Sequence, residues 1–338
     1  MTQKTTETQK RHFIIGTDAN YLHKALVFYE SLKQFESNFV LHLFCFDDIT
    51  YRVLKKLAYE DIVPYQPSDY ETEDLLKVKA SKKRQYEYYW TINPAMGKEI
   101  IGEQDADFIA LADCDLMFFQ SPEVLFDEYA GADVIIQPNN FSSRYVNDFV
   151  PVGYYCTSLQ CFRNNDNGRR ILDDWYSQCM EWCSSDFEEG KFGDQKYLDD
   201  WKIKYENVRE VANPGANVAP WNILKFELSE KDGQVVINNK WPLVYYHYHS
   251  FRMNLDTYEY IITGDRSNSY NIPPAVLELV YKPYIKRMIE VLEKLKQVDE
   301  YREYVQFNPG GLQKDFSGED VVFEEDKTTD GTTHAKVV

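Results

Sequence analysis

Residues 108–119 have the sequence FIALADCDLMFF. The apolar run 108–112 is typical of a central strand in a parallel sheet, because such strands are buried on both faces. Asp113 and Asp115 follow this strand at its carboxyl end, where open α/β sheets bind their ligands. Carboxylates between apolar segments are costly unless a cation or hydrogen bonds compensate them. Hard divalent cations bind carboxylate oxygens and keep positions free for phosphate oxygens, so Asp113 and Asp115 are candidate ligands of Mn²⁺ or Mg²⁺.

The segments before this strand alternate between strand and helix patterns. The apolar runs 12–16 and 39–46 have the length of strands, and residues 20–35 and 50–59 carry apolar residues at helical spacing. This order predicts an α/β fold with a parallel sheet and crossover helices. Elsewhere we expect helices at 80–101, 122–129, 168–183 and 193–201, and strands at 133–137, 153–162, 208–211, 235–238 and 243–249.

The chain divides into four parts by composition. We expect residues 1–11 to be disordered, residues 12–255 to form the main domain and residues 256–305 to form a C-terminal extension. The extension contains a long amphipathic helix from residue 274 to about residue 305. The tail at 306–338 is acidic and poor in apolar residues, which indicates disorder.

The overall charge limits the partners that the protein can have. The 338-residue chain has 55 acidic and 37 basic residues and a formal net charge of −18. Nucleic-acid partners require clustered lysine and arginine, so this balance excludes nucleic acid as the main partner. It does not exclude a nucleotide, since one bound cation or one basic patch neutralises a diphosphate. Aromatic residues make up 15% of the chain, and Tyr and Trp suit sugar and nucleoside rings as well as the core.

Two features bear on where the protein works. The sequence contains no apolar leader and no membrane-spanning run, and its six cysteines lack disulfide-framework spacing, so we expect a cytoplasmic protein. The helix at 274–305 has a basic edge that either caps the core or contacts the inner face of an anionic membrane. This edge is formed by Lys282, Lys286, Arg287, Lys294 and Lys296.

A second group of chemically active side chains lies in the expected strand 243–249. In an extended strand His247 and His249 point to the same face. Either imidazole could complete the cation site, since a nitrogen ligand beside carboxylates suits Mn²⁺. Two structural histidines in an aromatic strand are the alternative.

Two shorter motifs stand where helices are expected to begin. Thr17, Asp18 and Tyr21 follow the first strand, in a loop that could hold a nucleoside: Asp18 would accept from a base or ribose, and Tyr21 would stack. Asp194 and Gln195 open the helix at 193–201. For both motifs a plain helix cap is the alternative.

Together these four motifs resemble those of the metal-dependent glycosyltransferases with the GT-A fold. The likeness is strongest to the retaining group that includes glycogenin and the bacterial lipopolysaccharide galactosyl- and glucosyltransferases, and it extends to related bacterial glycosyltransferases of surface-polysaccharide gene clusters. It covers residues 12–255 and implies an α/β, Rossmann-like nucleotide-diphospho-sugar transferase fold, here with a C-terminal helical extension. The segment 215–222 (GANVAPWN) also resembles a loop of the bacterial relatives.

The resemblance implies a donor site built around the first strand and the Asp-x-Asp stretch. Thr17, Asp18 and Tyr21 match the motif that binds the nucleoside. Asp113 and Asp115 match the motif that holds Mn²⁺ (or Mg²⁺) and the diphosphate of the nucleotide-sugar donor.

The resemblance also implies roles for the later motifs. Asp194 and Gln195 match the pair at the reacting face of the donor sugar, which makes them the candidate catalytic residues. His247 is the better match to the metal-binding histidine, and His249 is the reserve. Apart from the resemblance, Arg84, in the basic cluster 82–84, could add positive charge near the diphosphate; a solvated basic start of a helix is the alternative.

Three departures from the family pattern concern the sugar and phosphate contacts. The family's Asn-x-Gly before the middle strand is PVG at 151–153. The last glycine of the histidine motif is Ser250, and the lysine that grips the diphosphate has no match. Arg252 is the nearest cation and therefore the candidate for that contact.

The sequence thus predicts a hexosyltransferase that uses a nucleotide-diphosphate sugar, with a UDP-sugar favoured. The acceptor is expected to be a hydroxyl of a glycan or lipid-linked glycan, and the resemblance implies metal dependence and retention of configuration. One alternative is a non-catalytic carbohydrate- or nucleotide-binding protein. The other, a haloacid-dehalogenase-type phosphatase, is disfavoured because Leu116 and Met117 follow the Asp-x-Asp where that class has Thr or Val close by. The sequence indicates no particular oligomeric state.

Overall fold

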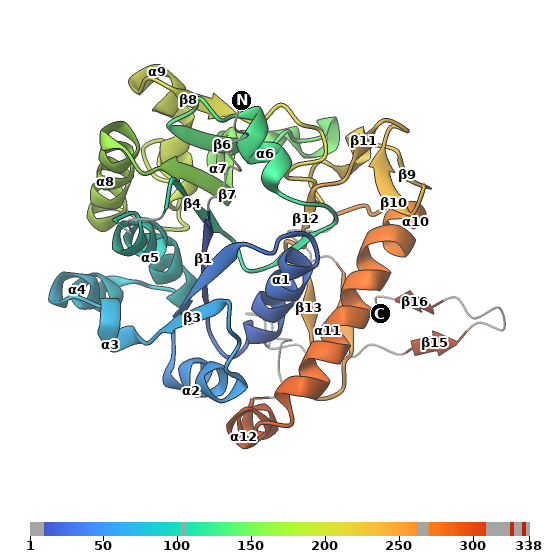
Figure 1. Ribbon diagram of the computed structural model, residues 1–338. Coiled ribbons are helices and arrows are strands. Elements are labelled where there is room, and N and C mark those ends of the chain that lie inside the picture. Colours follow the sequence, from blue (N-terminus) through green and yellow to red (C-terminus); the bar gives the residue numbers. More distant parts are fainter. Residues whose placement is uncertain (1–9, 103–105, 263–269, 309–324, 328–332, 336–338) are drawn as a thin grey trace, which may run out of the picture.

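The structure, a computed structural model, describes residues 10–102, 106–262, 270–308, 325–327 and 333–335 (Figure 1). The first strand begins at Arg11, one residue before the expected start of the main domain, and Arg11 Nε donates to Glu123 Oε1 at 2.6 Å. The rest of the disorder expected at 1–11 concerns residues outside the described ranges, apart from Lys10. Of the tail at 306–338, the structure describes residues 306–308 and two short paired strands, β15 (Glu325–Lys327) and β16 (Thr333–Ala335).

A seven-stranded sheet with the order β3-β2-β1-β4-β7-β6-β8 forms the centre of the molecule. The neighbours β3, β2, β1 and β4 are parallel, as expected from the alternating strand and helix patterns, whereas β7 runs antiparallel to both β4 and β6. The fold is therefore α/β with a mostly parallel sheet. Its strands are β1 (Arg11–Thr17), β2 (Phe39–Cys45), β3 (Ile62–Tyr65), β4 (Phe108–Ala112), β6 (Val134–Pro138), β7 (Tyr155–Arg163) and β8 (Val208–Glu210).

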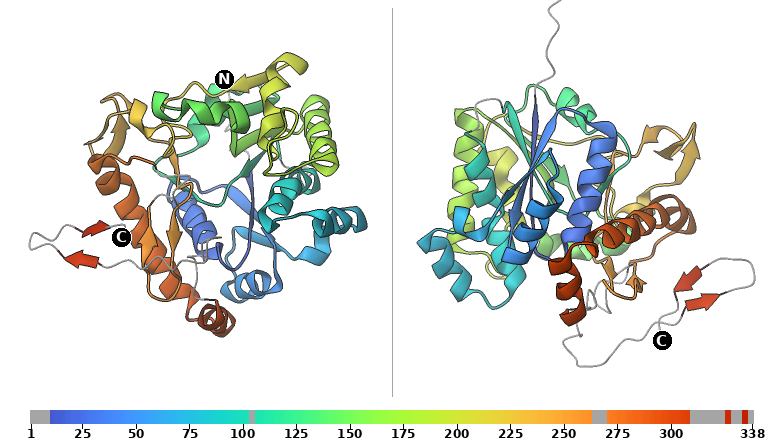
Figure 2. Two further views of the ribbon diagram at one scale, coloured as in Figure 1. Left: turned by 180° about the vertical axis from the view of Figure 1, so that it is seen from behind. Right: turned by 60° about the horizontal axis from the view of Figure 1, so that its bottom comes forward.

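Helices cover both faces of this sheet (Figure 2). The helices before the C-terminal extension are α1 (Leu22–Phe35), α2 (Asp48–Leu57), α3 (Pro67–Tyr70), α4 (Glu73–Ser81), α5 (Gln85–Ile100), α6 (Glu123–Glu128), α7 (Phe149–Val152), α8 (Asp166–Glu181) and α9 (Trp201–Lys204). The extension contributes α10 (Pro274–Val276), α11 (Lys282–Leu295) and α12 (Asp299–Phe307). Helices α5 and α8 lie on one face, and α1 and α11 lie together on the other.

Strand alternation divides the buried side chains between two cores. Phe13 and Ile15 of β1 pack into the cluster that contains α1 and α11, while Ile14 packs into the cluster that contains α5 and α8. All three side chains are fully buried, as a strand covered on both faces requires. The C-terminal extension thus shares one apolar core with the first helix of the chain.

Short sheets outside the central one build the region beyond the strand ends. Strand β5 (Leu116–Phe118) pairs antiparallel with β12 (Tyr245–His247), and β13 (Arg252–Met253) pairs with β14 (Tyr260–Ile261). A separate antiparallel sheet contains β9 (Leu228–Lys231), β10 (Gln234–Ile237) and β11 (Trp241–Pro242). The β5–β12 pair matters most for function, because it joins residues that are distant in the sequence.

Two of the expected helices are wrong in their extent. The helix expected at 80–101 is interrupted, because α4 ends at Ser81 and α5 starts anew at Gln85 with Glu87 capping the Arg84 backbone N–H. The single helix expected at 274–305 contains a π-helical segment, Leu277–Tyr281, and breaks again after Leu295. Val298 is extended there, and Asp299 begins α12, where an acidic residue suits the positive end of a helix.

The basic edge of α11 contacts acidic and polar side chains of the chain itself. Lys294 donates to Glu30 at 2.7 Å and Arg287 to Gln34 at 3.1 Å, and both partners belong to α1. Lys282 pairs with Glu278 at 2.9 Å. The contacts of Lys294 and Arg287 attach α11 to α1 of the main domain, whereas the Lys282 pair lies within the extension. None of the described helices has the length and apolar character needed to cross a membrane.

Candidate active site

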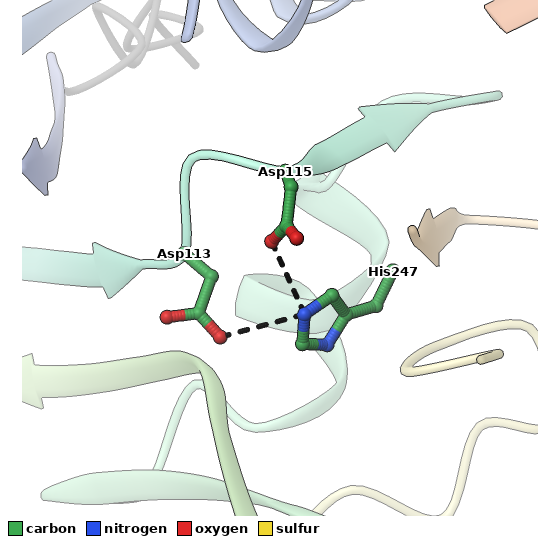
Figure 3. A group of neighbouring side chains, drawn as sticks. All are labelled: Asp113, Asp115 and His247. Atoms are coloured by element: carbon green, nitrogen blue, oxygen red, sulfur yellow. Dashed lines mark ion pairs between the residues drawn. The ribbon is translucent and has the colours of Figure 1, made fainter. Parts of the chain in front are cut away.

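Asp113, Asp115 and His247 converge at the carboxyl end of β4 (Figure 3). His247 Nε2 lies 3.1 Å from Asp115 Oδ1 and 3.7 Å from Asp113 Oδ2. One ligand atom from each residue lies within 4.8 Å of the others, which is close enough for a single metal ion to contact all three. His247 is buried, whereas the two carboxylates are partly exposed and can be reached by a ligand.

The backbone explains why three residues so distant in sequence meet. The Asp113 N–H donates to Ser158 O at 3.0 Å, which continues the β4–β7 ladder by one residue. The chain then turns at Cys114 into β5, whose Leu116 is paired with His247 of β12. The Tyr248 N–H donates to Asp115 O at 2.9 Å and closes the group. Each side chain is therefore positioned by strand pairing.

The charges of the group are strongly coupled. Desolvation would lower the pKa of His247, but the charges of Asp115 and Asp113 and the contact with Asp115 raise it well above its ordinary value. Desolvation would raise the pKa of Asp115, but the His247 imidazolium holds it well below the ordinary range. For Asp113, desolvation and the nearby Asp115 and Asp194 outweigh His247 and raise the pKa to about 7.

The three side chains fit a divalent cation. Carboxylate oxygens with one imidazole nitrogen suit Mn²⁺, and carboxylates alone also suit Mg²⁺. The raised pKa values of Asp113 and His247 mean that, without a cation, protons compensate the negative charge. A cation would take the place of these protons.

His249 lies beside this group but outside it. Strand β12 ends at His247, and Ser250 has φ 65°, so the alternation that would place both histidines on one face stops too early. The imidazole of His249 packs 5.5 Å from the ring of Trp221, and Trp221 also packs 5.2 Å from His247. Burial and the neighbouring His247 lower the pKa of His249 to about 4. Of the two histidines, His247 has the geometry of a ligand.

The segment 215–222 holds His247 from the other side. The His247 N–H donates to Val218 O at 2.8 Å, and the Trp221 indole donates to Asn139 O at 2.8 Å. Asn217 has φ 50° and its side chain bridges Ser158 and Pro138 O, which anchors the segment to β7.

Thr17, Asp18 and Tyr21 form the loop between β1 and α1. Asp18 Oδ1 accepts from the Tyr21 N–H at 3.1 Å, which stabilises the turn before α1, while Asp18 Oδ2 accepts from Tyr89 OH at 3.3 Å. The N-cap residue of α1 is Tyr21, and it has no side-chain capping bond. Burial and the nearby Asp47 raise the pKa of Asp18. Tyr21 is 43% exposed, so its ring can contact a ligand. The expected alternative of a plain helix cap is therefore wrong for Asp18, whose contacts stabilise the turn before α1 and leave room for a ligand at Tyr21.

Asp194 and Gln195 lie at the start of a short 3₁₀ helix, Gln195–Asp200. The side chain of Asp194 is buried, and its Oδ2 accepts from Asn93 Nδ2 at 3.1 Å. Burial raises the pKa of Asp194 to about 6, and Asp194 in turn raises the pKa of Asp113. Gln195 Nε2 donates to Val152 O at 3.1 Å, next to the departure from the family pattern at 151–153. Gly193 before them has φ 54° and lies against Trp90, which favours glycine there.

A family model for nucleotide-diphospho-sugar transferases matches residues 38–211, just over half of the chain. The chain belongs to this family. The matched region contains the Asp-x-Asp stretch and Asp194, whereas the loop after β1 and His247 lie outside it.

Solved structures of the same fold support the assignment. The galactosyltransferase LgtC, in complex with donor and acceptor sugar analogs, has a TM-score of 0.53 at 14% identity, covering 86% of this chain and 99% of LgtC. An active-site mutant of LgtC gives a TM-score of 0.52 at 12% identity, covering 86% of this chain and 99% of that one. The predicted GT-A fold is confirmed, and this nucleotide-diphospho-sugar transferase is a glycosyltransferase.

Two Bacillus subtilis (strain 168) proteins are similar along most of their length. The uncharacterized protein YfnD is 29% identical over 292 residues, which is 83% of this chain and 91% of YfnD. The uncharacterized protein YfnF is 29% identical over 239 residues, which is 69% of this chain and 78% of YfnF.

The two predicted site arginines of this transferase, Arg84 and Arg252, make their contacts with residues outside the Asp-Asp-His group. The Arg84 guanidinium contacts Glu87, Ser185 and Asp186, so two carboxylates share its charge. Arg252 lies in β13, close enough to His249 for its charge to lower the pKa of that imidazole.

Three residues near the site of this transferase were not predicted from the sequence. Tyr89 and Asn93, which contact Asp18 and Asp194, are four residues apart on α5 and so share one face. Polar groups on the buried side of a helix were the sequence feature from which these two residues could have been predicted. Lys24, in the first turn of α1, lies next to Asp115. A lysine at the start of an otherwise apolar helix face was the sequence feature from which its role near the site could have been predicted.

Metal binding by this transferase is expected to strengthen as the pH rises. Ligation requires Asp113 and His247 without their protons, and both have raised pKa values. Between pH 6 and pH 8 we therefore expect the Mn²⁺ affinity to increase by about tenfold from the Asp113 proton alone. The His247 proton adds up to tenfold more per pH unit. Calorimetry in buffers of different ionisation enthalpy measures both the affinity and the released protons. A pH-independent affinity without proton release would contradict this charge assignment.

Proposed function

We propose that the protein transfers a hexose from a nucleotide-diphosphate sugar to a hydroxyl of a glycan or lipid-linked glycan, in polysaccharide biosynthesis. A UDP-sugar is the favoured donor, the reaction depends on Mn²⁺ or Mg²⁺, and the configuration at the anomeric carbon is retained. The observation that carries this proposal is the convergence of Asp113, Asp115 and His247 at the carboxyl end of β4 in a family of nucleotide-diphospho-sugar transferases.

In this proposal the donor extends from the loop after β1 to the Asp-Asp-His group. Thr17, Asp18 and Tyr21 bind the nucleoside, with Asp18 accepting a hydrogen bond and Tyr21 stacking. A hydrogen bond from Tyr89 and the Tyr21 N–H already orients the Asp18 carboxylate. The arrangement of these residues beside β1, the neighbour of β4 in the sheet, supports a single continuous donor site.

Asp113, Asp115 and His247 hold the metal ion in this proposal. The ion supplies Lewis-acid stabilisation of the charge that develops on the leaving diphosphate. His247 contributes a nitrogen that strand pairing and the ring of Trp221 keep in position. Arg252 and Arg84 are proposed to add positive charge once the donor is bound, and for Arg84 this requires exchanging its contacts with Glu87 and Asp186.

Asp194 and Gln195 act at the anomeric carbon. As the bond to the diphosphate breaks, positive charge grows on the sugar ring, and the buried Asp194 carboxylate stabilises it. The acceptor hydroxyl attacks from the side on which the diphosphate leaves, so the new glycosidic bond keeps the configuration, and its proton passes to the departing phosphate oxygen. The resemblance to retaining enzymes supports this stereochemical outcome.

A screen of nucleotide-sugars tests the proposal. The full-length protein is incubated with UDP-, GDP-, CDP- and dTDP-sugars and Mn²⁺, and release of the nucleoside diphosphate is measured with and without EDTA. We expect hydrolysis of at least one UDP-sugar that EDTA abolishes and added Mn²⁺ restores. No hydrolysis and no metal-dependent binding of any nucleotide would instead favour a non-catalytic carbohydrate-binding protein.

A further inference from the structure

We infer that Lys24, in the first turn of α1, is a side-chain cation that binds the diphosphate of the donor, in addition to the metal ion and the arginines of the proposed function. This inference rests on the proposed function, because it requires a diphosphate at the Asp-Asp-His group. It fills a gap left by the sequence, in which the lysine expected after the histidine motif has no exact match and Arg252 is the nearest cation.

The position of Lys24 is fixed by three contacts. Its Nζ donates to Phe251 O at 2.8 Å, lies 3.9 Å from Asp115 Oδ2 and lies 4.1 Å from the centre of the Tyr21 ring. Asp115 thus faces His247 with one oxygen and Lys24 with the other. The ammonium therefore lies between the residue proposed to stack on the nucleoside and a proposed metal ligand.

This position is unfavourable for a lysine unless an anion uses it. Lysine is almost never buried without a partner, and the charged partner of Lys24, which is only 3% exposed, is Asp115 at 3.9 Å, a carboxylate that also faces His247. It is also the third residue of α1, where the helix dipole repels a positive charge, and that first turn contains no acidic residue. A helix N-terminus at the end of a parallel strand favours anions, and Lys24 adds a full charge to it.

A charge count leads to the same conclusion. The charges of two carboxylates and a divalent cation sum to zero. The diphosphate of a nucleotide-sugar carries roughly two negative charges, which therefore remain uncompensated in a partly desolvated site. An ammonium has three N–H donors; one is used by Phe251 O, and the others can reach phosphate oxygens. Lys24 supplies one of the two missing positive charges from a position at the site that its contacts already fix.

The test separates diphosphate binding from folding. Lys24→Met removes the charge, and Lys24→Gln removes the charge but keeps an N–H donor; Lys33→Gln, on the exposed part of the same helix, is the matched control. Calorimetry measures binding of UDP with Mn²⁺, of uridine alone and of Mn²⁺ alone, and thermal unfolding reports on the fold. These readouts do not depend on sugar transfer.

We expect UDP affinity to fall by about 10- to 100-fold in both Lys24 variants, as for a lost charge-assisted hydrogen bond, with uridine affinity unchanged. Mn²⁺ alone should bind slightly more tightly, because a positive charge beside Asp115 is gone; a purely structural role would not produce these opposite signs. Equal losses for UDP and uridine, or unchanged UDP affinity, overturn the inference while leaving the proposed function intact. Wild-type protein that binds no UDP overturns both.

Discussion

Replacing Asp115 by asparagine is expected to lower kcat/KM for sugar transfer by at least about 100-fold, above the range typical of residues that only support a metal ligand. The substitution keeps the size of the side chain but removes a charge that faces both His247 and Lys24. Asp115 keeps its negative charge well below neutral pH, so the wild type has this charge throughout the working pH range, whereas asparagine has it at no pH.

The loss should appear first in binding. Titration of Mn²⁺ in the presence of UDP, followed by calorimetry or electron paramagnetic resonance, is expected to show a loss of metal affinity that matches the loss of activity. Asp127→Asn, on the exposed side of α6, removes the same charge outside the Asp-Asp-His group and should leave both quantities unchanged. Asp115→Asn protein that still binds UDP and Mn²⁺ like the wild type would remove Asp115 from the metal site.

The sequence was sufficient to predict that Asp113 and Asp115 lie at the end of a buried strand. A fully apolar strand followed by Asp113 and Asp115 has few physical explanations, and strand β4 ends at Ala112 as the pattern indicates. The sequence also implied that the loop after β1 lies close to Asp113 and Asp115, because neighbouring parallel strands end at the same edge of a sheet.

The choice between His247 and His249 could not be made from sequence. Alternation predicts one shared face only while a strand continues, and β12 ends at His247 because its partner β5 is just as short. Where a strand ends depends on its pairing partner, which lies about 130 residues earlier in the chain. The resemblance favoured His247, and the geometry of the group agrees.

Lys24 was missed for a related reason. Helical spacing at 20–35 correctly predicted α1, but that pattern does not say which element lies against each face of the helix. Packing of β5 and of the segment around Phe251 against α1 turns Lys24 from a surface lysine into a buried one. Such contacts depend on tertiary structure.

Asp194→Asn is expected to lower kcat by about 100- to 1,000-fold, the effect typical of losing one preorganised electrostatic contact to a transition state. Asp194 is not part of the Asp-Asp-His group, so UDP and Mn²⁺ affinities should stay within about threefold of the wild type. Asparagine fits the same space beside Asn93, which limits the structural cost. Single-turnover transfer and UDP calorimetry on the same preparation measure the two quantities separately.

The pH profile decides whether this effect belongs to the Asp194 charge. Its pKa is raised to about 6 by burial, so the carboxylate is formed above pH 6 and lost below it, and wild-type kcat should fall tenfold per pH unit on the acid side. With saturating metal and donor, Asp113 remains ionised and does not contribute to this acid limb. The limb should disappear in Asp194→Asn. In Asn93→Ala it should move to higher pH, because the hydrogen bond from Asn93 favours the ionised form. An unchanged acid limb in Asp194→Asn would mean that Asp194 acts only by shaping the pocket.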